Sequence, residues 1–478
     1  MKLSYQRYFL LTLLVVGSAV LDVDAHRKVP SVSVVVGERP TALPSSVEHS
    51  VRGGGTTKAP PSPPLAGASG SGTATIPNEV FNLVKNIVGA GVLSLPAGVA
   101  AFGNAPSALI PALSLIAVIG CLSAFGFACI GKVCAYTGAT SYREAWEKTV
   151  GPSTSWIPAS SATFMTFSAC LAYSMILADT FAALLRRPAQ RKLVLMGITT
   201  FILLPLCWMK ELSSLAPFSL LGVMGMGFTA IAMTLRYLDG SYQTGSKLLE
   251  SVAEGLRPSF GKDGWQSVFR PSALILVSML STAYMCHFNA SKFYLELRNN
   301  TLSRYHQVVG YSFGISILLM GFLTAMGFLT FGANSDGLVL NNYAAGDVWI
   351  GASRVAVALS LVFSYPLAFQ GCRDGVLDLL KVPPSKRSNA TLNVTTLAVL
   401  ALLTLLAATL TDVSFVLSFG GATLGNLLTY IYPAMMYYKM VALKKLPNEG
   451  FGVTLSIISA ILGTIMGGIG AKQAIDAM

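Results

Sequence analysis

Long apolar runs follow one another from residue 79 to the end of the chain, with polar residues gathered between them. Each run is long enough, as a helix, to cross a hydrocarbon core of about 30 Å. A helix is the expected form because the membrane core offers the backbone no hydrogen-bond partners. The pattern predicts eleven spans, at residues 80–104, 107–131, 158–184, 193–209, 214–236, 271–293, 307–330, 349–371, 394–411, 413–437 and 451–471.

The first and sixth runs are each interrupted near mid-span. The first contains "NLVKNIVGAGVLSLPAG" at 82–98, where Gly89, Gly91 and Pro96 weaken the helical hydrogen-bond ladder. The sixth contains a small and polar stretch, 281–289. Broken backbone at membrane depth is tolerated where it is buried in protein or lines a cavity. Interruptions in corresponding spans of two halves predict a central transporter site, with a kinked, closely packed helix as the alternative.

Residues 1–78 differ from the rest of the chain. Residues 1–25 place Lys2 and Arg7 before a short apolar stretch, which predicts a signal or targeting peptide, or alternatively an extra amphipathic or anchoring helix. Residues 26–78 contain "APPSPPLAGASGSGTAT" and no aromatic residue, which predicts a disordered tail before an eleven-span domain at 79–472. A cleaved peptide would leave the tail outside, whereas the Lys and Arg balance of the loops weakly favours a cytoplasmic start, so both orientations stay open.

Composition supports a membrane protein and removes several other classes. Apolar residues make up 53% of the chain and charged residues 11%, too few to build a water-exposed surface. The net charge of +12 is scattered among short loops without a nucleic-acid-binding motif, so no nucleic-acid partner is expected. The seven cysteines lie in spans or at span ends and indicate no disulfide framework. Motifs for nucleophiles, nucleotides and metals are missing from the sequence, so neither an enzyme nor a cofactor is expected.

Three further features of the spans have packing explanations. The glycines of "GVMGMG" (222–227) lie inside a predicted span with no strand before them, so they predict helix packing rather than a dinucleotide loop. "GGATLG" (420–425) is interpreted in the same way. Asp179 is an acid within the third span, and we expect it to pair with Arg186 or to lie at the membrane interface.

Several stretches resemble the amino acid/auxin permease family. "FNLVKNIVGAGVLSLPAGVAAFG" resembles that family's first span, and "CHFNASKFYLELRN" resembles the end of its sixth. "MGFLTFGANSDGLVLNNY", "SYPLAFQGCRDGV" and "SFGGATLGNLLTYIYPAMMYY" are similar to its spans seven, eight and ten. The resemblance covers roughly residues 78–472. It implies an all-α polytopic membrane protein with the LeuT-type fold, five plus five inverted helices and an eleventh span, and cation-coupled transport of neutral amino acids.

The resemblance also implies a substrate site. The carboxylate and amine of an amino acid would lie against the backbone at the two interruptions, with a tyrosine of the third span facing the substrate. The residues that match are Val88, Gly89, Ala90, Gly91, Val92, Ser281, Thr282, Tyr284 and Tyr173.

The coupling ion is less clearly indicated than the substrate. Asn82 matches an asparagine that helps to hold sodium in sodium-coupled members, and Ser360 and Ser364 of the eighth span are the candidate partners. Val362 stands between the two serines, so sodium would find few oxygen ligands and protons are favoured. His287 is the histidine inside a span, and its ordinary pKa near neutrality suits a coupling role, with packing of the broken span as the alternative.

The sequence therefore predicts a secondary active transporter of neutral amino acids that works by alternating access, driven by protons or sodium. An amino-acid sensor that keeps the fold and signals without net transport is the alternative. The expected partners of the protein are the amino acid, the coupling ion and the lipid bilayer. Its expected location is the plasma membrane or an endomembrane.

Overall fold

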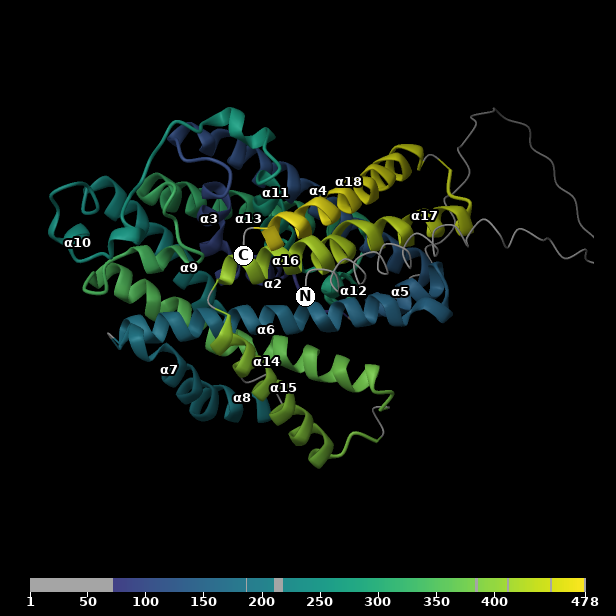
Figure 1. Ribbon diagram of the computed structural model, residues 1–478. Coiled ribbons are helices and arrows are strands. Elements are labelled where there is room, and N and C mark those ends of the chain that lie inside the picture. Colours follow the sequence, from purple (N-terminus) through teal and green to yellow (C-terminus); the bar gives the residue numbers. More distant parts are fainter. Residues whose placement is uncertain are drawn as a thin grey trace, which may run out of the picture. The chain divides into compact units, whose positions relative to one another are not determined.

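The computed structural model describes residues 72–185, 187–209, 218–382, 386–410, 412–447 and 449–476. These residues belong to one compact unit, 63–478, and are almost entirely helical (Figure 1). Within the described ranges, β-structure amounts to two isolated bridges. The targeting peptide predicted at 1–25 and the tail up to residue 71 lie outside the described residues.

The first span is broken, as the sequence predicts. Helix α2 (Ile76–Ile87) is followed by the 3₁₀ turn η1 (Ala90–Ser94) and by α3 (Leu95–Ala100), and the two halves are bent by 44°. The predicted tail ended at residue 78, and the structure corrects this boundary. The Ala74 N–H donates to the Glu296 carbonyl at 3.0 Å and its carbonyl accepts from the Arg298 N–H at 2.9 Å, so residues 74–78 are already folded.

The remaining spans of the first half follow the predicted order. The second and third spans are α4 (Leu109–Thr137) and α6 (Trp156–Leu184). The fourth is one continuous helix made of α7 (Arg191–Ile198), the π-helical turn η5 (Thr199–Leu203) and α8 (Leu204–Trp208). The fifth is α9 (Phe218–Leu238). Between the second and third spans, α5 (Tyr142–Thr149) forms a short amphipathic helix, capped by the Ser141 side chain.

The second half begins with a second broken span. Helix α11 (Ala273–Ala283) leads through the 3₁₀ turn η9 (His287–Asn289) to α12 (Ala290–Glu296). The later spans are α13 (Leu302–Phe331), α14 (Val348–Leu379), α15 (Asn389–Thr409), the tenth span, and α18 (Gly450–Asp476). The tenth span comprises α16 (Val413–Gly420), two π-helical turns, η12 (Gly421–Gly425) and η13 (Leu427–Ile431), and α17 (Tyr432–Lys444).

A helical element therefore lies at each of the eleven predicted positions. By length and composition, nine helices of the described ranges can cross a membrane, the bent α2–α3 pair makes a tenth, and α9 occupies the predicted fifth span. Two ends were placed too early. The second span was predicted to stop at 131, but α4 continues to Thr137, where Gly138 ends it in the left-handed conformation (φ 66°). Likewise α14 continues past the predicted 371 to Leu379.

Close packing of long helices brings the two halves together. Helix α14 packs along α6 and α9, and α13 packs along α2 and α4 (Figure 1). Two of the three glycines at 222–227, Gly222 and Gly225, serve this packing, as predicted. The Ser360 side chain occupies the space beside Gly222, and a Cβ added to Gly225 would lie 3.0 Å from the Ala356 side chain.

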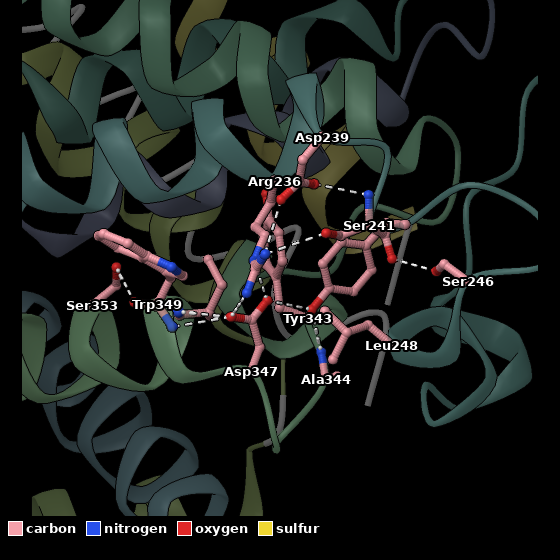
Figure 2. A network of polar contacts seen from close by, with 12 residues as sticks. Arg236, Asp239, Ser241, Ser246, Leu248, Tyr343, Ala344, Asp347, Trp349 and Ser353 are labelled. Carbon is pink, nitrogen blue, oxygen red and sulfur yellow. Dashed lines mark hydrogen bonds and ion pairs between the residues drawn. The ribbon is translucent and has the colours of Figure 1, made fainter.

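A polar network fixes the long loop between α9 and α11 to the start of α14. Figure 2 shows the Arg236 side chain between Asp239 and Asp347. The buried Asp347 carboxylate accepts from both Nε and Nη2 of Arg236, at 2.8 and 2.9 Å, and from the Tyr242 hydroxyl at 3.0 Å. It also caps α14 through the amides of Trp349 and Ile350. Burial, and then the Asp347 carboxylate, raise the pKa of Tyr242 above its usual range, so its phenol stays protonated and donates.

Candidate functional site

The break in the first span lies between Val88 and Gly89. The Val88 N–H closes the last turn of α2 on the Val84 carbonyl at 2.7 Å, and its ψ of 83° then leaves the helical range. Gly89 is extended, with φ −102° and ψ −177°, before η1 begins. A helix end leaves carbonyls without intrahelical partners and a helix start leaves amides without them. The break therefore presents both kinds of backbone group at one place in the membrane.

The break in the sixth span is packed against the first. The Tyr284 N–H donates to the Leu280 carbonyl at 2.9 Å and ends α11, and the chain resumes a helical turn at His287. Helix α11 contacts both η1 and α3. The two interruptions that the sequence singled out, almost two hundred residues apart, are therefore neighbours in the structure.

The tenth span closes the site from a third side. The Thr282 hydroxyl of α11 donates to the Leu417 carbonyl of α16 at 2.6 Å. A Cβ added to Gly91 would lie 3.8 Å from the Leu417 side chain, so α16 also faces the first break. At Gly421, a Cβ would overlap the backbone oxygen of Ser278, which shows how closely η12 approaches α11.

Tyr173 is the side chain that reaches the first break from α6. A Cβ added to Gly89 would lie 3.7 Å from the Tyr173 hydroxyl, and both residues are partly exposed. The structure thus places the predicted Tyr173 beside the predicted backbone of 88–92. Val88 and Val92 are buried and contribute apolar walls. A phenol over open backbone groups suits a small zwitterion better than an apolar ligand.

The other predicted side chains are engaged within the protein. Ser281 donates to the Val277 carbonyl at 3.1 Å and lies 3.4 Å from the Tyr430 hydroxyl. Tyr284 is buried, and its hydroxyl donates to the Ile116 carbonyl of α4 at 3.1 Å. Backbone rather than side chains is therefore what 281–286 can offer to a ligand.

The predicted sodium ligands are spread over different helices. Asn82 is exposed on α2. Ser360 and Ser364 are partly buried on α14, and the Ser360 hydroxyl lies against Gly222 of α9. The role of the two serines and of Asn82 in ion binding stays a prediction.

His287 is completely buried behind the sixth-span break. Its Nε2 donates to the Ser123 carbonyl at 2.9 Å, and its ring meets Phe127 edge-on at 5.7 Å. Nδ1 has no hydrogen-bond partner within the described ranges. These contacts are those of a residue that packs α12 against α4, which was the alternative considered for it from the sequence.

Two acidic residues differ from the sequence-based expectation. Asp179 forms an ion pair with Arg191 of α7, and Arg186, the partner expected from the sequence, lies outside the described residues. Glu79 was not singled out, because it lies just before the predicted start of the first span. It is nevertheless 1% exposed. A signal was present, since Glu79 shares one helical face with Leu83 and Ile87 at spacings of four residues.

Two broken spans that pack against each other and are flanked by long helices of two halves define the LeuT-type fold. The structure is similar to the crystal structure of MhsT in complex with L-phenylalanine, with a TM-score of 0.50 and 14% identity, covering 83% of this chain and 98% of that one. The predicted fold class is confirmed.

The chain belongs to the family described as transmembrane amino acid transporter protein, whose model matches residues 72–475. It is a multi-pass membrane protein. A Danio rerio protein with the provisional name sodium-coupled neutral amino acid transporter 11 is 23% identical over 84% of this chain and 87% of its own length. Vacuolar amino acid transporter 5 of Schizosaccharomyces pombe is 24% identical over 77% of this chain and 85% of its own. The family resemblance inferred from the sequence is confirmed.

Proposed function

We propose that the protein is a secondary active transporter that moves neutral amino acids across a membrane by alternating access, driven by a proton or sodium gradient. The observation that carries this proposal is the pair of adjacent broken spans. Their open backbone groups provide partners for the carboxylate and the amine of a substrate, and the breaks are hinges between half helices.

In this proposal the substrate lies between the two breaks. Its carboxylate accepts from the amides of Ala90 and Gly91 at the start of η1, since those of Gly89 and Val92 already donate to backbone carbonyls. Its amine donates to carbonyls at the end of α11, around Ser281 to Tyr284. Tyr173 contributes a hydroxyl at the first break. Support comes from the 3.7 Å proximity of the Tyr173 hydroxyl to the Cβ position of Gly89 and from the contact of α11 with η1.

The names of the relatives support amino acids as the substrate class. They do not distinguish protons from sodium as the coupling ion, or the plasma membrane from a vacuolar membrane. The Danio rerio relative is named for sodium and neutral amino acids, and the Schizosaccharomyces pombe relative for the vacuole. We place the protein in the plasma membrane or a vacuolar membrane. The family match and the names of the relatives favour a transporter over an enzyme.

The test is uptake of labelled neutral L-amino acids into proteoliposomes that contain the purified full-length chain. An inward proton gradient, an inward sodium gradient and no gradient are compared. Accumulation above equilibrium under one gradient is the expected result. Binding without accumulation under either gradient would refute transport and favour the sensor.

A further inference from the structure

Helix α2 buries an acid that nothing in the described structure satisfies. Glu79, the fourth residue of α2, is 1% exposed, and both of its carboxylate oxygens lack a hydrogen-bond donor in the described ranges. Its neighbours on the same face of α2, Leu83 and Ile87, are 0% and 2% exposed. An ionised carboxylate in such surroundings, without a donor or a cation, would cost several kcal/mol. The packing seen here therefore accepts the neutral, protonated acid.

The charged groups that face Glu79 come from the end of α12. Lys292 and Glu296 act on it electrostatically, with opposite signs. Their own side chains are 68% and 50% exposed and lie 3.8 Å apart as an ion pair. Lys292 is thus shared with Glu296, whose carboxylate would repel an ionised Glu79.

Among the described residues, the other helices packed on α2 provide no hydrogen-bond donor to the Glu79 carboxylate either. Tyr305 of α13 is the titratable group nearby, and its hydroxyl hydrogen is directed to the carbonyls of Phe127 and Ala290, at 3.2 and 3.4 Å. In the described part of α9 the charged side chain is Arg236, which is paired with Asp347. Glu79 is thus held by packing alone.

Helix α2 is a separate half helix that can expose this acid. It joins the rest of its span only through the extended residue Gly89. Its start is attached to the end of α12 by the Ala74 bridge and to α13 by a bond of 3.3 Å from the Ser312 hydroxyl to the Val80 carbonyl. Movement of α2 away from α12 and α13 would bring water to Glu79. Water stabilises the ionised form, so the acid would then release its proton.

We propose that Glu79 is the proton-binding group of the transport cycle, protonated while α2 is packed and deprotonated to bulk water when α2 swings away. This inference rests on the proposed transport function and names its coupling ion. The proton comes from the aqueous phase and returns to it, and the residue itself is unchanged after each cycle.

The test compares the wild type with Glu79→Gln in proteoliposomes, using a labelled mixture of neutral L-amino acids. A glutamine has the shape of the protonated acid and cannot release a proton. For one proton per substrate, a gradient of one pH unit supports accumulation of roughly tenfold in the wild type. In Glu79→Gln we expect accumulation to fall to equilibrium, while exchange of labelled against unlabelled substrate without a gradient continues within about twofold of the wild-type rate. Glu296→Gln, which changes the exposed carboxylate beside it, is the matched control: it should still accumulate substrate above equilibrium, with a displaced pH profile because it no longer repels an ionised Glu79.

Each other outcome counts against the proposal. Proton-driven accumulation by Glu79→Gln, sodium-driven accumulation by the wild type, or loss of exchange together with accumulation would overturn the role of Glu79 and leave transport itself standing. Neither exchange nor accumulation in the wild type would instead refute the proposed function, and the inference with it. Glu79→Asp keeps an acid, one methylene shorter, and decides the matter if the glutamine variant does not fold. We expect it to accumulate substrate with a displaced pH profile, and an unchanged profile would count against Glu79.

Discussion

Replacement of Asp347 by Asn tests whether the polar network at the start of α14 stabilises the protein. The Asp347 side chain is completely buried, and it accepts two bonds from Arg236 and one from Tyr242 (Figure 2). An asparagine keeps one oxygen for the cap of α14 and loses the charge and the second acceptor. Breaking a buried ion pair by removing one partner costs roughly 3–5 kcal/mol. Because Arg236 retains Asp239 and is itself 17% exposed, we expect the low end, about 3 kcal/mol.

Asp239→Asn is the matched control for this variant. Asp239 contacts the same guanidinium at 2.9 Å, but its side chain is 43% exposed. An exposed pair of this kind contributes about 0–1 kcal/mol. The same change from carboxylate to amide, made in a more exposed partner of the same arginine, is therefore expected to lower the free energy of unfolding several-fold less.

The assay is thermal unfolding of the purified protein in detergent, with proteolysis of the 239–272 loop as a local probe. Asp347→Asn should lower the unfolding temperature by several degrees and speed cleavage of the loop, and Asp239→Asn should do neither. In the double variant Asp347→Asn/Arg236→Gln, part of the loss should be recovered, because the arginine that has lost its buried partner is no longer present. Equal unfolding temperatures for the two single variants would refute the reasoning.

Three further substitutions test the site, and a fourth, Gly227→Ala, is a control. Gly421→Ala forces a Cβ into the Ser278 backbone oxygen and should cost about 2–3 kcal/mol of stability, whereas Gly227→Ala, which meets nothing within 4 Å, should be neutral or slightly stabilising in the same unfolding assay. Tyr173→Phe removes the hydroxyl beside Gly89 and should raise the KM of uptake up to roughly tenfold with an unchanged unfolding temperature; an unchanged KM would remove Tyr173 from the site. Tyr284→Phe removes a bond to α4 and should lower stability by about 1 kcal/mol, more than it changes KM; the reverse order would place that hydroxyl on the substrate.

The sequence predicted the helices well because each long apolar run has one stable form in a membrane. It also located both breaks, because Gly89 and Pro96, and the polar residues after Ser281, cannot continue a regular apolar helix. The helix ends were less accurate. The second span was ended at 131, just before Lys132, although a long basic side chain can continue a helix while its amine reaches polar surroundings.

The contents of the site were predicted less completely, because they depend on which side chains turn toward one another. Spacing could not show that Thr282 donates to α16 or that Ser281 lies near Tyr430, since those partners are more than a hundred residues away. Nor could spacing show that the Glu79 carboxylate has no hydrogen-bond donor among the described residues. That property belongs to the packing of three helices and is not encoded in any local motif.

The bridge at Ala74 has a consequence for the speed of transport. Separation of α2 from α12 must break both backbone hydrogen bonds between Ala74 and the end of α12. Each contributes about 1 kcal/mol net, so together they raise the barrier to separation by about 2 kcal/mol. A barrier higher by that amount slows the step roughly thirtyfold. Because both bonds are made by the main chain, side-chain substitutions near the start of α2 would leave this contribution to the barrier in place.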